Sequence, residues 1–197
     1  MIVLGLTGSI GMGKSTTAIM FASEGIPVHD SDEVVHRLYA GKAAHLIAAA
    51  FPGTVSAGVV DRKRLSSAVL DDQNKLRKLG EIVHPLVRAD QDAFLARHRA
   101  AKTPLVVLDI PLLFETGATD RVDDILVVTA PAEIQKARVM SRPGMTAEKF
   151  KAILANQVAD RDKRRNADFV IDTGAGMDAA REAVRHVIKT LSDRDRR

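Results

Sequence analysis

Residues 8–15 read G-S-I-G-M-G-K-S and form a complete phosphate-binding motif, G-x-x-x-x-G-K-[ST]. The motif follows an apolar run at residues 2–6 and precedes residues 17–22, which can continue as a helix. Glycines let the backbone turn tightly and point N–H groups at phosphate oxygens. The following helix presents the positive end of its dipole to the same anion. The motif therefore predicts binding of a nucleoside triphosphate together with Mg²⁺.

Two side chains of the motif have expected chemical roles. Lys14 supplies a positive charge to the β- and γ-phosphates, which makes it both a nucleotide-binding and a catalytic candidate. The hydroxyl of Ser15 is placed to coordinate Mg²⁺. The residues of the motif expected to contact the nucleotide are Gly8, Gly11, Met12, Gly13, Lys14, Ser15 and Thr16.

An acidic pair, Asp30 and Asp32, follows the second predicted strand. In an open parallel sheet, ligands bind beyond the carboxyl ends of the strands, so both acids are expected at the edge where the phosphate motif lies. Asp30 and Glu33 fit a helix capping box, which explains Asp30 structurally. We therefore assign Asp32 to chemistry, as the carboxylate that orients or deprotonates an attacking hydroxyl. His36 would share a helical face with Asp32. It could orient the Asp32 carboxylate, contact the substrate, or be an ordinary surface histidine.

Residues 109–115 follow the third predicted strand and hold further candidates. Asp109 ends the strand run, where related nucleotide-binding folds often carry an acid that binds Mg²⁺ through water. It could equally bond the N–H groups of the next loop. The apolar residues that follow, Leu113 among them, could wall a substrate pocket or belong to the core.

Two more groups could contact anions. Pro85 is expected to start a helix, on which His84 and Arg88 would project close together; an ordinary helix start is the alternative. Arg138 and Arg142 lie four residues apart on one predicted helix and could reach one phosphate. They open a segment, residues 138–168, where basic residues outnumber acidic ones and where residues 146–157 are predicted to be helical. We favour a mobile basic lid, with Gln157 and Lys163 on its second arm, over a solvated helical hairpin.

The elements that must position these residues follow from the apolar pattern. Runs rich in β-branched residues predict strands at 2–6, 26–29, 105–110, 125–129 and 169–172. Because helical stretches separate these runs, they predict an α/β fold of three layers, α/β/α, with a central parallel five-stranded sheet. Residues 33–51 and 61–100 read as helices joined by a loop at 51–58. We therefore expect one domain over residues 1–197, with a helical insertion at 33–100 and the lid at 138–168.

Composition narrows the classes of function. The chain of 197 residues has no cysteine, which excludes disulfides, thiolate metal sites and a cysteine nucleophile. It carries a net charge of +4, yet only 4% of its residues are aromatic, so small phosphorylated ligands are favoured over nucleic acid. No apolar run reaches membrane-spanning length and no targeting segment is evident, so we expect a cytoplasmic protein without a membrane partner.

Several motifs, taken in order along the chain, resemble the dephospho-coenzyme A kinase family. They are L-T-G-S-I-G-M-G-K-S-T at residues 6–16, D-S-D with His36 downstream, V-D-R-x-x-L at 60–65, I-V-H-P-L-V-R at 82–88, I-P-L-L-F-E at 110–115, Gln157, Lys163 and A-D-F-V-I-D at 167–172. The resemblance implies transfer of the γ-phosphate of ATP to the ribose 3′-hydroxyl of dephospho-coenzyme A, the last step of coenzyme A synthesis.

The family pattern also implies roles for single residues. It implies that Asp32 is the base near the acceptor hydroxyl and that the insertion with His84 and Arg88 receives the coenzyme. It places Arg138, Arg142, Gln157 and Lys163 in the closing lid. The chain departs from the family pattern at Ile153, where an arginine is usual, and at Thr173, where an asparagine is usual. We still expect Thr173 to contact the nucleotide.

Two other functions share parts of this pattern. A kinase for nucleosides or nucleoside monophosphates would share the fold and the phosphate motif and would differ in its acceptor. A GTP-driven switch should carry an [NT]-K-x-D motif after a late strand, and none occurs, because Asn74 and Lys75 are followed by Leu76 and Arg77. The switch is therefore disfavoured.

Overall fold

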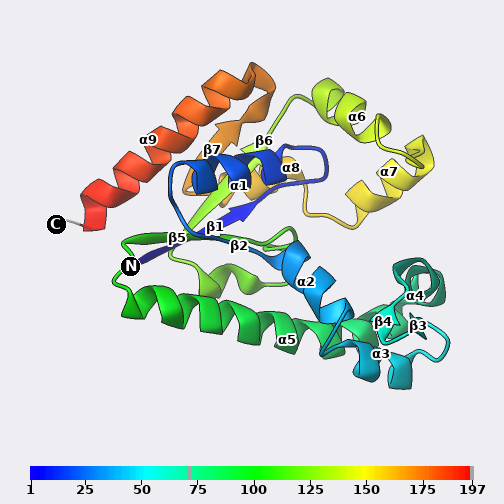
Figure 1. Ribbon diagram of the computed structural model, residues 1–197. Helices are drawn as coiled ribbons and strands as arrows, with labels where there is room; N and C mark the ends of the chain where they lie inside the picture. The colour runs from blue at the N-terminus through cyan, green and yellow to red at the C-terminus, as the bar shows by residue number, and fades with distance from the viewer. Residues whose placement is uncertain (71, 196–197) are drawn as a thin grey trace. The chain divides into compact units, whose positions relative to one another are not determined.

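The computed structural model describes residues 1–70 and 72–195. The chain forms two units, which are drawn together in Figure 1. The first unit comprises Met1–His29 and His98–Arg197, and the second comprises Asp30–Arg97. The assignment of residues 33–100 to substrate binding and of residues 138–168 to a lid stays a prediction.

A five-stranded parallel sheet organises the first unit and confirms the predicted fold class. Its central strand, β1, pairs with β5 on one side and β6 on the other, so the phosphate motif leaves the sheet from its middle. All residues of β5 are buried, as its continuous apolar run predicted. The strand order is β2-β5-β1-β6-β7, for β1 (Ile2–Thr7), β2 (Val28–Asp30), β5 (Leu105–Asp109), β6 (Asp124–Thr129) and β7 (Phe169–Asp172).

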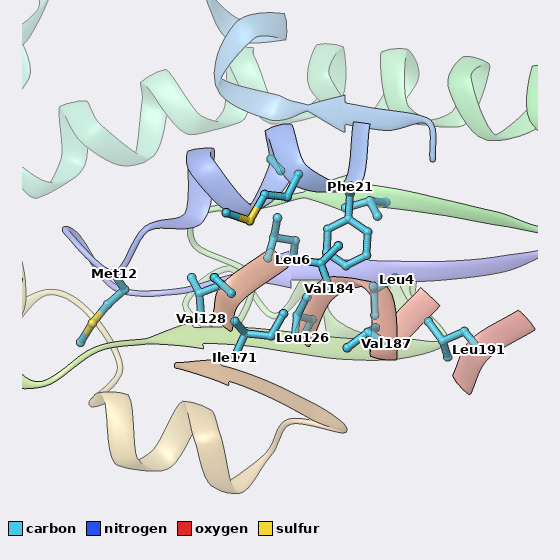
Figure 2. Packing of buried hydrophobic residues seen from close by; sticks show 14 of the residues in the cluster. Leu4, Leu6, Met12, Phe21, Leu126, Val128, Ile171, Val184, Val187 and Leu191 are labelled. Atoms are coloured by element: carbon cyan, nitrogen blue, oxygen red, sulfur yellow. The ribbon is translucent and has the colours of Figure 1, made fainter. Parts of the chain in front are cut away.

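Two helices, α1 (Lys14–Ser23) and α9 (Met177–Asp195), cover one face of this sheet. Side chains of a strand alternate between its faces, so the apolar residues at alternate positions of the strands join this core. Figure 2 shows Leu6, Leu126 and Ile171 from the strands packed with Phe21 of α1 and Val184 of α9.

The opposite face of the sheet is covered by shorter segments. A Cβ atom added to Gly5 of β1 would lie 3.0 Å from Val122 and 3.3 Å from Leu113, so the segment after β5 packs closely here. The short helix α8 (Asp160–Arg165) packs on β6, where the Thr129 hydroxyl donates a hydrogen bond of 3.0 Å to Asp160. The sheet is therefore covered on both faces.

The second unit has its own apolar core, which includes Ile47, Leu65 and Val83. The predicted helix over 33–51 is broken between residues 40 and 43, and the predicted loop at 51–58 contains a strand. The elements of this unit are α2 (Ser31–Tyr39), α3 (Ala44–Ala50), the hairpin of β3 (Val55–Ser56) and β4 (Val59–Val60), α4 (Arg62–Val69) and α5 (Gln73–Ala100), whose last residues belong to the first unit.

The prediction that Pro85 starts a helix is wrong. Pro85 lies inside α5, a helix of 28 residues. A proline inside a helix removes one backbone hydrogen bond and strains the preceding turn, but it does not always end the helix. Burial of Val83, Phe94 and Leu95 on either side of the proline stabilises the continuous helix.

The first unit also contains α6 (Ala132–Met140), α7 (Ala147–Ala155) and two 3-10 turns, η1 (Ala118–Arg121) and η2 (Thr173–Ala175). The helix expected at 146–157 is α7, whose first turn is capped by the Thr146 side chain. Across the described residues, none of the helices combines the length and the apolar character needed to cross a membrane.

Candidate active site

The phosphate loop between β1 and α1 needs its glycines for steric reasons. Gly11 and Gly13 have φ angles of 78° and 88°, in the left-handed region that glycine adopts readily. A Cβ atom at Gly8 would lie 2.5 Å from Val128 Cγ2, and one at Gly11 would lie 2.5 Å from Val139 Cγ2. The loop is therefore pressed against β6 and α6, and no larger residue fits at these positions without movement.

The first turn of α1 is open to an anion. Gly13 is its N-cap, and within the described residues no side chain caps the turn and no acidic residue lies in it. The first N–H groups of a helix lack partners inside the helix, and they carry the positive end of the helix dipole. Ser15 and Thr16 are exposed in this turn, where both were expected to contact a nucleotide.

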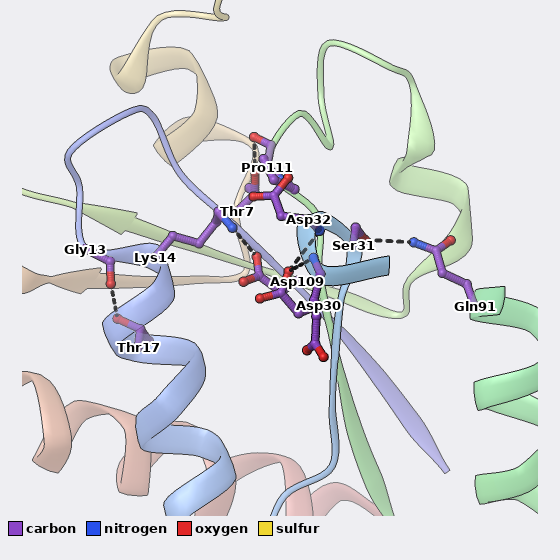
Figure 3. A network of polar contacts seen from close by, with 11 residues as sticks. Thr7, Gly13, Lys14, Thr17, Asp30, Ser31, Asp32, Gln91, Asp109 and Pro111 are labelled. Carbon is purple, nitrogen blue, oxygen red and sulfur yellow. Dashed lines mark hydrogen bonds and ion pairs between the residues drawn. The ribbon is translucent and has the colours of Figure 1, made fainter. Parts of the chain in front are cut away.

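Lys14 and Asp109 form a close ion pair at the centre of the site. Lys14 Nζ lies 2.6 Å from Asp109 Oδ1, and the side chain of Asp109 is only 1% exposed (Figure 3). The Thr7 hydroxyl donates a hydrogen bond of 3.2 Å to the carbonyl of Pro111, which joins the end of β1 to the segment after β5. The structure thus brings together the two predicted residues Lys14 and Asp109.

Oxygen ligands suitable for Mg²⁺ are present at this point. Mg²⁺ prefers oxygen atoms and is usually held by one or two protein groups plus substrate phosphates. Ser15 offers an exposed hydroxyl and Asp109 a carboxylate beside Lys14. Among the described residues, no cluster of three or more histidine or carboxylate side chains could hold a metal by itself. The donor set therefore fits a Mg²⁺ ion that arrives with a nucleotide.

Arg138 contacts the phosphate loop through Thr173. Its Nη1 and Nη2 donate hydrogen bonds of 2.8 Å each to the hydroxyl and the carbonyl of Thr173. The Thr173 hydroxyl lies 2.9 Å from the carbonyl of Met12 and is positioned to donate to it. Both Arg138 and Thr173 were predicted site residues, but their contact was not foreseen.

The expectation that Arg138 and Arg142 share a helix is wrong. The helix α6 ends at Met140, so Arg142 lies beyond it, exposed, in the turn around Pro143. A residue before proline is disfavoured in the helical conformation, and this explains why the helix stops here. The spacing of four residues therefore does not align the two guanidinium groups.

Gln157 and Lys163 are not exposed arms of a basic segment. Gln157 Oε1 accepts a hydrogen bond of 3.1 Å from the N–H of Ile10 in the phosphate loop. Lys163 is fully buried, and its Nζ lies 2.9 Å from Glu115 Oε1. The Glu115 carboxylate also accepts a hydrogen bond of 2.9 Å from the N–H of Val158. Most other basic residues of the segment are exposed, as a lid or a hairpin would require.

Leu113 was predicted either to wall a substrate pocket or to belong to the core. Leu113 is fully buried, so a ligand would reach its side chain only if the surrounding chain moved.

The carboxyl of Glu148 accepts hydrogen bonds from the backbone N–H of Glu148 and from the Thr146 side chain, and these bonds lower its pKa below the ordinary value. Glu148 therefore stays ionised in the first turn of α7, where a negative charge favours the helix dipole.

The second unit holds the acidic candidates. Asp30 caps α2, because its carboxylate accepts hydrogen bonds of 2.8 and 3.0 Å from the N–H groups of Asp32 and Glu33. The predicted cap is thus confirmed, and Asp32 is left exposed in the first turn together with His36 one turn later. Gln91 of α5 donates a hydrogen bond of 3.2 Å to Ser31, which fastens the start of α2.

His84 and Arg88 both project from α5 into solvent. With Arg77 and Glu81 they line an open depression of about 440 Å³ on this helix. A Cβ atom at Gly80 would lie 3.0 Å from the His84 ring, so the glycine lets the imidazole lie close to the helix. The predicted proximity of His84 and Arg88 thus arises inside a long helix and not at a helix start.

Two residues at the site carry functions that the sequence did not signal. Gln135 lies in the middle of α6, where a buried glutamine has no recognisable pattern, and its side chain contacts the phosphate loop. Glu115 belongs to a quoted motif, but its pairing with Lys163 required the fold.

Comparisons with known proteins agree over nearly the whole chain. The family model described as dephospho-CoA kinase matches residues 2–178. A dephospho-CoA kinase of Mesorhizobium japonicum is 66% identical over 191 residues, which make up 97% of each protein. A crystal structure from Thermus thermophilus has a TM-score of 0.85 and 36% identity over 96% of both chains. A dephospho-CoA kinase from Campylobacter jejuni has a TM-score of 0.72 and 26% identity over 97% of both chains.

Proposed function

The chain belongs to the dephospho-CoA kinase family, and we propose that its phosphate loop and Asp32 together move the γ-phosphate of ATP to the ribose 3′-hydroxyl of dephospho-CoA. Phosphorylation of dephospho-CoA is the activity of this enzyme and completes the synthesis of CoA. ATP is the phosphate donor that a kinase of this family uses. The observation that carries the proposal is the open first turn of α1 beside the close pair of Lys14 and Asp109.

The loop binds the triphosphate through backbone N–H groups of Gly11 and Gly13 and of the first turn of α1, whereas the Met12 N–H donates a hydrogen bond of 3.1 Å to the carbonyl of Ser9 within the loop. Lys14 neutralises the β- and γ-phosphates, and its contact with Asp109 keeps the ammonium group at the loop. Arg138 adds a guanidinium group, which is held by Thr173, whose hydroxyl contacts the carbonyl of Met12 in the loop. The work of these residues is positioning and charge neutralisation, which dominate phosphoryl transfer.

Ser15 and Asp109 would hold Mg²⁺ together with the phosphates, since both offer oxygen atoms at the start of α1 and the end of β5. When bound, the ion would offset negative charge on the phosphate oxygens. Lys14 and Arg138 would act on the same oxygens from other directions.

Asp32 is the proposed general base. It follows β2 by two residues and is exposed on α2, so its carboxylate is free to accept the proton of an alcohol. We assign His36, His84 and Arg88 to the binding of dephospho-CoA, because all three are exposed on α2 and α5 and the arginine carries a positive charge. Leu113 and Lys163 are buried, and we assign them to the support of the site.

An ADP-release assay tests the proposed acceptor. Purified protein with Mg·ATP is supplied in turn with dephospho-CoA and with a panel of nucleosides and nucleoside monophosphates. We expect ADP release and formation of CoA with dephospho-CoA only. Rapid phosphorylation of a nucleoside, with no CoA formed, would contradict the assignment of the second unit to dephospho-CoA.

A further inference from the structure

Ile10, at the tip of the phosphate loop, is bonded through both of its main-chain groups by two glutamine side chains. Gln135 Nε2 donates a hydrogen bond of 2.7 Å to the carbonyl of Ile10, and Gln157 Oε1 accepts a hydrogen bond of 3.1 Å from its N–H. Gln135 is buried, at 6% exposure, and comes from α6, whereas Gln157 lies between α7 and α8. Two segments that are distant in sequence thus hold one residue of the loop.

The geometry around Gly11 strengthens this contact. A Cβ atom at Gly11 would lie 3.1 Å from the carbonyl of Gln135 and 3.3 Å from its Cγ, so the loop rests directly on this residue. Fixing the peptide groups of Ile10 limits the rotation of the peptide groups that follow it. These include the N–H groups of Gly11 and Gly13, which the proposed function assigns to the triphosphate.

Gln157 is itself held in place. Its neighbour Val158 donates a hydrogen bond of 2.9 Å to Glu115, which is also the ion-pair partner of the buried Lys163. Two contacts therefore fasten the segment that carries Gln157 to one residue, Glu115. The hydrogen bond from the N–H of Ile10 to Gln157 thus joins the phosphate loop to the residues between α7 and α8.

We propose that Gln135 is a positioning residue for ATP binding, and that it acts with Gln157 by holding Ile10 so that the loop is preorganised for phosphates. Preorganised donors bind better because they pay no ordering cost when the ligand arrives. The proposal rests on the proposed function only in that ATP binds this loop. The positioning role of Gln135 does not depend on which acceptor is phosphorylated.

The test compares Gln135→Met with the wild-type enzyme. Methionine has nearly the volume of glutamine but no amide, so packing under Gly11 is kept and the hydrogen bond to Ile10 is lost. We expect the Kd of Mg·ATP, measured by calorimetry without acceptor, and the KM for ATP to rise about five- to tenfold, the weight of one buried hydrogen bond. The KM for dephospho-CoA should stay within about twofold of wild type, since one lost contact to the loop leaves α2 and α5 unchanged.

Two further variants complete the design. Lys136→Met is the matched control, because Lys136 is exposed and adjacent on the same helix, and it should leave both constants unchanged. Gln157→Met removes the other bond to Ile10 and should also raise the Kd of Mg·ATP; it carries the test alone if Gln135→Met does not fold. In the double variant, the Kd of Mg·ATP should rise by less than the product of the two single effects, because both bonds hold one residue.

The outcomes separate the two proposals. Folded Gln135→Met and Gln157→Met enzymes with wild-type affinity for Mg·ATP would overturn the positioning role. So would a rise confined to the KM for dephospho-CoA. If the wild-type protein binds Mg·ATP but phosphorylates another acceptor, the proposed function fails while the effect of Gln135→Met on ATP affinity remains.

Discussion

Asp109 gives Lys14 a charged partner before any phosphate is bound. At 2.6 Å from a carboxylate that is 1% exposed, the ammonium group has already lost part of its water shell. A lysine that had to leave bulk water on binding ATP would meet that desolvation cost in full. The pair therefore prepares Lys14 to add a second anionic partner, and it predicts that the two residues depend on each other.

Replacing Lys14 with alanine should cost transition-state stabilisation and also leave the Asp109 carboxylate buried without its cation. We expect kcat/KM for ATP to fall by about two to three powers of ten, the effect of one preorganised charged contact. Steady-state kinetics with saturating dephospho-CoA measure the loss. Lys189→Ala on α9 serves as a control, because Lys189 is exposed there, and it should behave as wild type. Wild-type turnover by Lys14→Ala would exclude the phosphate loop from catalysis.

Asp32→Asn removes the proposed base and preserves the shape of the side chain. We expect kcat to fall by about two or more powers of ten, the usual scale for a general base, while the Kd of Mg·ATP changes little. The neighbouring Glu33 is exposed in the same turn, so Glu33→Gln is a matched control and should retain activity. If Asp32→Asn retains the wild-type kcat, another group accepts the proton.

At the scale of elements, the strands were predicted best, because a strand buried on both faces of a parallel sheet has a continuous apolar sequence, such as residues 105–108. Helix ends were predicted less well. Residues 40–43 interrupt an expected helix, Pro85 lies within one, and Arg142 lies outside one. These positions depend on tertiary packing and on single turns, to which local periodicity is insensitive.

Lys163 of α8 pairs with Glu115 in the segment after β5. We expect replacement of Lys163 alone to destabilise the protein more than replacement of both residues. Lys163→Met leaves Glu115, 12% exposed, without its cation, and it should lower the free energy of unfolding by about 3–5 kcal/mol. Glu115→Gln combined with Lys163→Met removes both charges and should recover most of that loss. Thermal unfolding measures both, at about 2–4 °C for each kcal/mol.

A surface pair on α9 provides the comparison. Arg185 and Glu24 are both partly exposed, so Arg185→Ala should cost no more than about 1 kcal/mol. A wild-type melting temperature for Lys163→Met would show that the buried pair does not stabilise the fold. A raised KM for dephospho-CoA in the double variant, at normal stability, would instead return Lys163 to the substrate site.

At the scale of the whole molecule, the sequence indicated which residues bind phosphate more readily than how they are held. The phosphate-binding residues of the motif at 8–15 are adjacent in the sequence, so the motif can be recognised without knowledge of the fold. The contacts of Ile10 with Gln135 and Gln157, and of Arg138 with Thr173, join positions that are 35 to 147 residues apart. No local pattern records such contacts, because they exist only once the sheet has formed.

The division into two units predicts separate responses to the two substrates in amide hydrogen exchange. A non-hydrolysable ATP analogue with Mg²⁺ should slow exchange at residues 8–16, because bound phosphates and an ordered loop suppress local opening. Dephospho-CoA alone should slow exchange in α2 and around residues 84–88 of α5, where the exposed His36, His84 and Arg88 are assigned to it. The C-terminal half of α9 serves as an internal reference and should not change. Protection of the first unit alone by both ligands would contradict the assignment of dephospho-CoA to the second unit, because each ligand is expected to order the residues that contact it.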